Sequence, residues 1–124
     1  MKVLYMTPIF PIIELIDRLA IAEIKRDRGV ENSLELGWYT DQMKSYDIKS
    51  IQEDFIELKN IHNSIWDLES DLKSGFENRH SLEELGLRAI EIRNLNNKRI
   101  KLKNNIAEKL NCKVREIKKE HLSQ

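Results

Sequence analysis

The sequence has little of the residues that interrupt helices, since it contains only four glycines and two prolines in 124 residues. It has three histidines and one cysteine, and their spacing matches no zinc site. Cys112 cannot form an intrachain disulfide, which indicates a reducing compartment. No uncharged apolar run approaches the ~18 residues that span a membrane. These absences argue against a strand-rich fold, a disulfide scaffold, a zinc module and a membrane protein.

An excess of one charge sign is also absent, because 21 Lys and Arg balance 21 Asp and Glu. A dedicated nucleic-acid binder normally carries a basic excess, so we do not expect nucleic acid as a partner.

The apolar stretch Val3 to Ile13 is followed at once by Glu14, Asp17 and Arg18. A secretion signal stays uncharged there, so we interpret this region as mature protein and expect a cytoplasmic location.

Helix start and stop signals predict four helices. The first begins at Pro8 or Pro11, runs to about residue 28 and stops at Gly29. Asn32 with Glu35 resembles a capping pair and opens a short second helix, to about residue 44.

The third predicted helix opens at Asp47 or Ser50, runs to about residue 73 and ends at Gly75. Ser81 with Glu84 forms a capping box for the fourth, which continues to about residue 110. Three long helices and one short helix with short loops predict an all-α antiparallel bundle. We expect a single domain over residues 1–124, with 112–124 as a short helix or a loose tail.

Several charged or polar residues fall on helix faces that are otherwise apolar. The first helix is apolar around most of its circumference, which predicts a central position, and acids interrupt its buried face. Burying an unpaired charge costs several kcal/mol, so we expect these acids to meet bases of the fourth helix in an interior or cleft-lining network. The candidate site residues are Asp17, Glu23, His62, Glu69, Arg88, Asn96, Arg99 and Lys103. Glu14 falls instead on a narrow polar strip, and His80 and His121 are expected at the surface.

Two interpretations of this network remain open. A structural network would fix the register of the helices. A ligand pocket would hold a phosphate, a carboxylate or a metal–nucleotide, with Arg99 and Lys103 binding the anion. Asp17, Glu23 and Glu69 would then orient the bases or bind Mg²⁺. No motif predicts a resident cofactor or metal.

Specific chemistries find little support in the motifs. A ferritin-like di-metal site needs two Glu-x-x-His pairs, whereas Lys59 stands three residues before His62. Glu14-x-x-Asp17 resembles one half of the acidic motif of the all-helical nucleotide pyrophosphohydrolases, but the second Glu-x-x-Glu helix is absent. The basic stretch 82–109 has only a weak similarity to the first helix of helical chorismate mutases.

Three sequence blocks resemble a family of short all-helical proteins of unknown function found in bacteria and phages. The blocks are Glu14-Leu15-Ile16-Asp17-Arg18-Leu19 with Glu23-Ile24-Lys25, Ile65-Trp66-x-Leu68-Glu69, and Asn96-Asn97-x-Arg99-x-x-Leu102-Lys103. Arg18 and Asn97 depart from the family pattern, which has Lys and Asp there. The resemblance implies no activity, but it includes six of the eight candidate site residues.

The leading functional prediction is a cytosolic helical module that forms homo-oligomers through an apolar face left uncovered by its few helices. The alternative is a small binding protein or hydrolase for a nucleotide or phosphate ligand that uses the ionic cluster with Mg²⁺. Whether the chain is an enzyme stays open at this stage.

Overall fold

The computed structural model of the chain describes residues 11–77 and 80–112, apart from the side chains of 75–77. Four α-helices make up most of this region: α1 (Ile12–Asp27), α2 (Ser33–Met43), α3 (Gln52–Glu77) and α4 (Leu82–Lys109). A single 3₁₀ turn, η2 (Lys49–Ile51), leads into α3. No strand occurs in the described residues, so the predicted all-α fold with three long helices and one short helix is confirmed.

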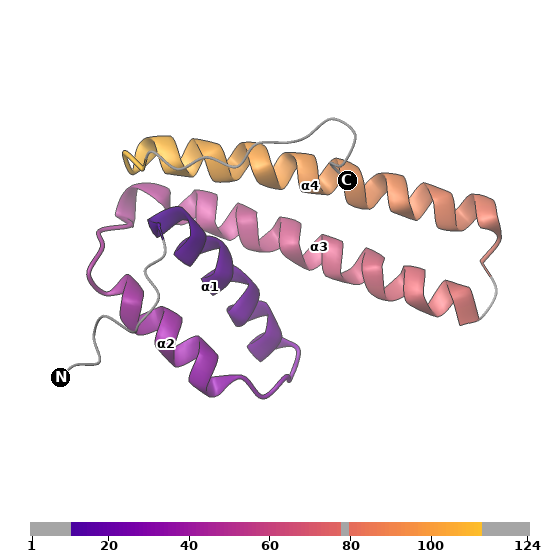
Figure 1. Cartoon of the computed structure of the whole chain (residues 1–124), viewed down its shortest axis with the longest axis horizontal. Coiled ribbons are helices and arrows are strands. Elements are labelled where there is room, and N and C mark those ends of the chain that lie inside the picture. The colour runs from indigo at the N-terminus through magenta and orange to yellow at the C-terminus, as the bar shows by residue number, and fades with distance from the viewer. Residues whose placement is uncertain (1–10, 78–79, 113–124) are drawn as a thin grey trace.

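The two longest helices, α3 and α4, form an antiparallel hairpin (Figure 1). α1 lies obliquely against one half of this hairpin, and α2 runs back beside α1 on the side away from it (Figure 1). α1 therefore contacts each of the other three helices, whereas α2 packs against α1 alone among the helices. None of the described helices is long and apolar enough to cross a membrane.

The helix ends follow the predicted signals at some sites and depart from them at others. The Ser81–Glu84 capping box forms, with the Glu84 amide donating to Ser81 Oγ at 3.1 Å and the Ser81 amide donating to Glu84 Oε1 at 2.8 Å. Gly29 and Asn111 have positive φ angles of 84° and 57° and follow α1 and α4 closely, as predicted. The proposed start at Pro8 lies outside the described residues, and Pro11 immediately precedes α1.

The bounds of α2 agree with the prediction, but its predicted side-chain cap and the predicted end of α3 were wrong. Asn32 precedes α2 but does not cap it, because its amide donates to the Ala22 carbonyl at 2.9 Å and to Glu35 Oε1 at 3.2 Å. This side chain ties the loop back to α1 instead. α3 also continues through Gly75 to Glu77, since a glycine inside a helix costs only about 1 kcal/mol and no proline follows.

The hydrophobic core lies between α1 and the half of the α3–α4 hairpin against which α1 packs. The largest fully buried side chains come from α1, η2, α3 and α4: Ile13, Ile16, Ile24, Ile51, Leu58 and Ile106. Trp38 and Tyr39 of α2 pack against this core, with an edge-to-face contact of 5.3 Å between their ring centroids. The short helix is thereby held by its aromatic residues.

We predict that Ile16→Ala lowers the free energy of unfolding by about 2–5 kcal/mol, because it leaves a cavity where the side chain is 1% exposed. Urea denaturation followed by circular dichroism measures this loss. Ile56→Ala is the matched control, since Ile56 is 60% exposed and should change stability by less than about 0.5 kcal/mol. Equal losses in the two variants would contradict the position of the core.

Candidate functional site

The carboxylate of Asp17 is the centre of a buried cluster that joins three helices. Its Oδ1 lies 2.7 Å from His62 Nε2 of α3. Its Oδ2 lies 3.4 Å from a guanidinium nitrogen of Arg99 and 3.6 Å from Lys103 Nζ, both of α4. The Asp17 side chain is only 11% exposed. One acid of α1 thus contacts polar groups of both hairpin helices.

Two further residues complete this central cluster. Glu14, one turn earlier on α1, places its Oε2 3.1 Å from Lys103 Nζ. Asn96 accepts a hydrogen bond of 3.2 Å from Arg99 Nε within α4. Two carboxylates therefore face a lysine, an arginine and an imidazole. Such pairing offsets much of the cost of burying these groups.

Electrostatics favour the charged form of Asp17. Burial by itself raises the pKa of this carboxyl, because it removes the negative charge from water. The hydrogen bond with His62 and the positive charges of His62, Lys103 and Arg99 lower it, and they outweigh burial. The pKa of Asp17 therefore lies below its usual value of 3.8. Asp17 is an ionised anchor at neutral pH rather than a proton donor.

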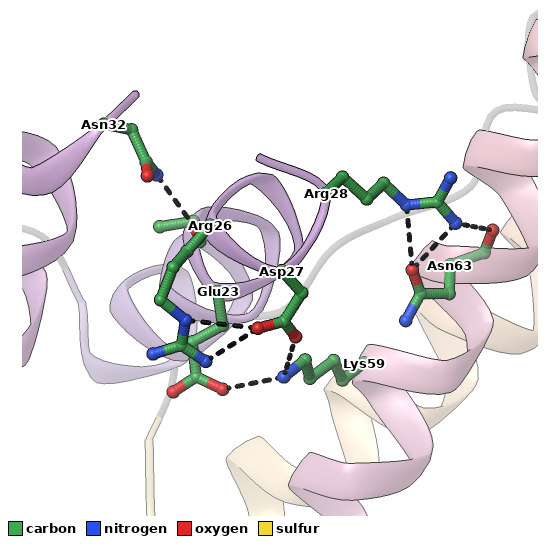
Figure 2. Close-up of polar contacts among 8 residues, drawn as sticks. Glu23, Arg26, Asp27, Arg28, Asn32, Lys59 and Asn63 are labelled. Atoms are coloured by element: carbon green, nitrogen blue, oxygen red, sulfur yellow. Dashed lines mark hydrogen bonds and ion pairs between the residues drawn. The ribbon is translucent and has the colours of Figure 1, made fainter. Parts of the chain in front are cut away.

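A second cluster forms at the carboxyl end of α1 (Figure 2). Lys59 of α3 lies 3.2 Å from Glu23 and 2.9 Å from Asp27. The hydrogen bond between Lys59 and Asp27 is the largest cause of the raised pKa of Lys59. The same hydrogen bond is the largest cause of the lowered pKa of Asp27. Arg28 also reaches α3, where it donates to Asn63 Oδ1 at 3.0 Å (Figure 2).

The Arg28 guanidinium makes two more contacts with α3. It lies 2.8 Å from the carboxylate of Asp67 and 5.1 Å from the ring centroid of Trp66. A cation over an aromatic face is attracted by the ring quadrupole. Arg28, the residue directly after α1, therefore continues the α1–α3 contact past the end of the helix.

A third cluster lies near the turn of the hairpin. Asp71 of α3 pairs with Arg88 of α4, and its Oδ1 lies 3.1 Å from His80 Nε2. His80 Nδ1 lies 3.6 Å from Glu84 Oε1. The hydrogen bond from Arg88 is the largest cause of the lowered pKa of Asp71. This cluster closes the end of the hairpin that is farthest from α1.

The eight predicted site residues do not form one network. Seven of them are divided among the three clusters, and Glu69 lies outside all of them. Asp17, His62, Asn96, Arg99 and Lys103 form the central cluster; Glu23 belongs to the second and Arg88 to the third. Glu69 is exposed beside Trp66 and Lys73, so the expectation that it lies on a buried face is wrong. At 1.5 Å per residue, the six residues from Asp17 to Glu23 span ~9 Å, which is too far for one cluster.

Sequence reasoning missed several partners in these clusters. Glu14 was placed on the polar strip, but its side chain extends along α1 and reaches the buried Lys103. Lys59, Asp71 and His80 were not selected, because each lies outside the apolar face of its helix or in a loop. The sequence shows only that each of these residues can carry a charge opposite to that of its partner. The partners are far apart in the sequence and meet only through the packing of the helices. His121 lies outside the described residues.

The central cluster joins α1 to both helices of the hairpin. Within the described residues, no group of three or more His, Cys, Asp or Glu side chains is placed to hold a metal ion. Arg99 and Lys103 both contact the α1 carboxylate of Asp17. A phosphate would have to compete with Asp17 and Glu14 for these cations. The arrangement orients side chains for packing and presents no acid–base pair around an open position.

Fold and site together define an all-helical protein in which buried ion pairs join one central helix to a long hairpin. The chain belongs to a family of unknown function (DUF6165), whose model matches residues 8–121. No curated protein and no solved structure matches it. The prediction that the chain belongs to a family without an assigned function is confirmed. The three motif blocks and the occurrence in bacteria and phages stay predictions.

We predict that Asp17→Asn lowers the free energy of unfolding by about 3 kcal/mol, because it removes the anion that faces Arg99 and Lys103. Asp41→Asn is the matched control, since Asp41 is 68% exposed and pairs with Lys44 at the surface. Its loss should stay below about 1 kcal/mol. Thermal and urea unfolding measure both, and equal effects would show that the central cluster contributes no more than a surface pair.

A second prediction concerns acid. A carboxyl whose folded pKa is lowered contributes stability above its unfolded value, here 3.8, and loses it as pH falls through the folded pKa. The wild-type protein should therefore lose more stability than Asp17→Asn between pH 6 and pH ~3. The other carboxyls with lowered pKa act equally in both proteins. Parallel stability–pH curves would contradict this role for Asp17.

Proposed function

We propose that the protein is a self-associating helical module and that the outer half of its hairpin makes the contact. This outer half comprises α3 from Leu68 onward and α4 up to Leu95. The contacts that join α1 to the hairpin lie between Lys59 and Asp67 on α3 and at Arg99 and Lys103 on α4. The hairpin extends well beyond α1 and α2 (Figure 1).

The observation that carries the proposal is the exposure of large aliphatic side chains on this outer half. Leu82 is 86% exposed, Leu87 is 55% exposed and Ile90 is 46% exposed, and all three lie on α4. Burying such side chains contributes roughly 1.5–3 kcal/mol each when they leave water completely. Among the described residues no third helix covers this half of the hairpin, and association with another copy would bury these side chains.

A second copy of the chain suits this surface better than a partner of one charge. The formal net charge is zero, so two copies do not repel one another at long range. Most soluble oligomers are symmetric assemblies of identical chains, and a two-fold axis lets one surface patch cover itself. Two hairpins packed face to face would form a four-helix arrangement with the packing of ordinary bundles.

The test is the solution mass by sedimentation velocity over a range of concentrations. We predict a species of twice the 14.7 kDa chain mass for the wild type. Leu87→Glu should weaken association by at least ~10-fold, since it places a charge in the contact. Leu34→Glu is the matched control, because Leu34 is 91% exposed on α2 and lies away from the hairpin. A strictly monomeric wild type would overturn the proposal.

A further inference from the structure

One face of the hairpin carries a shallow groove between α3 and α4. Its volume is about 460 Å³, and Leu68 of α3 and Leu95 of α4 supply its apolar floor. Glu91, Asn94 and Lys98 of α4 form one wall, in steps of three and four residues. Residues with this spacing share one side of a helix, so they form a continuous stripe along α4.

This stripe faces away from α1. At 100° per residue, Glu91, Asn94 and Lys98 lie at least about 80° around α4 from Arg99 and Lys103, which contact α1. Leu87 continues the same stripe one turn before Glu91 and is 55% exposed. The groove therefore lies on a side of the hairpin that α1 does not cover, next to an exposed leucine of the proposed contact.

The charges of the stripe complement a second copy in one orientation only. Glu91 and Lys98 form no salt bridge with any described residue, although the charge of Glu91 helps to raise the pKa of Arg88, whereas Asp67, which also lines the groove, is paired with Arg28. If two α4 helices run antiparallel with Asn94 facing Leu95 of the other copy, Glu91 of each faces Lys98 of the other. A parallel pairing would put like charges opposite one another, which costs affinity.

The same register also gives the largest overlap. The point between Asn94 and Leu95 lies within one residue of the middle of α4, which runs from Leu82 to Lys109. Antiparallel copies centred there overlap along almost the whole helix, ~40 Å at 1.5 Å per residue. The α4 strip alone is ~10 Å wide, so α3 beside it has to contribute a similar area for the face to reach the ~800 Å² per partner of a standard interface.

We infer that the partner of the groove is a second copy of this chain, bound through an antiparallel α4–α4 contact with its two-fold axis at Asn94 and with two reciprocal Glu91–Lys98 pairs. This inference rests on the proposed self-association and specifies its geometry, in which the contact extends beyond the outer half of the hairpin along α4 to Lys98 and further. It assigns the groove, the two unpaired charges and Leu87 to one isologous interface.

Charge reversal tests the pairing. Glu91→Lys and Lys98→Glu should each raise the dimer dissociation constant about 10-fold or more, because each places like charges opposite one another twice. The double variant Glu91→Lys with Lys98→Glu restores both pairs and should return the constant to within about 3-fold of the wild type. Arg93→Glu, an exposed reversal on another side of α4, is the control and should change little. Failure of the double variant to recover would overturn the register.

Cysteine cross-linking tests the two-fold axis independently. In a Cys112→Ser background, Asn94→Cys should form an interchain disulfide on mild oxidation, because residues 94 of the two copies face one another. Lys101→Cys should not form this disulfide. In the proposed register the two copies of position 101 are offset by 13 residues, a distance of ~20 Å along the α4 helix axis, which is too far for a disulfide. A wild type that stays monomeric defeats the proposed function itself. A dimer in which Lys101→Cys cross-links and Asn94→Cys does not defeats only this geometry.

Discussion

The packing of α1 on the hairpin depends on one buried carboxylate. Asp17 faces His62 on one side and Arg99 and Lys103 on the other, so a single charge joins three helices. Removing Asp17 from this group leaves its cations with less compensating negative charge in a medium of low dielectric. Shape complementarity among aliphatic side chains allows α1 to slide or rotate, whereas ion pairs of this kind accept one register.

The remaining ion pairs extend this constraint along α1. Lys59 bridges Glu23 and Asp27, and Arg28 reaches Asp67 about two turns further along α3. Together with the central cluster they fix α1 at both ends against the same helix. Because the cations of each cluster contact carboxylates from a neighbouring helix, the polar interior is explained by helix packing before any ligand is invoked.

The unequal lengths of the helices create the surface on which function is proposed. α1 has 16 residues, whereas α3 has 26 and α4 has 28, so α1 covers little more than half of the hairpin. The uncovered half keeps Leu82, Leu87 and Ile90 exposed. A longer α1 would cover more of the hairpin, and in the proposed dimer a second copy covers part of the half that α1 leaves exposed.

The sequence by itself determined the helices, because capping residues such as Ser81, the glycine after α1 and apolar periodicity act over a few neighbouring positions. It also selected Asp17, Arg99 and Lys103, since a charge within an apolar stripe can be recognised without knowing its partner. Only the tertiary structure decided which charges meet: Glu14 joined the central cluster, and Glu69 stayed in solvent. Periodicity gives the angle of a side chain around its own helix, but a contact also requires the height and crossing angle of the neighbouring helix, and packing alone sets these.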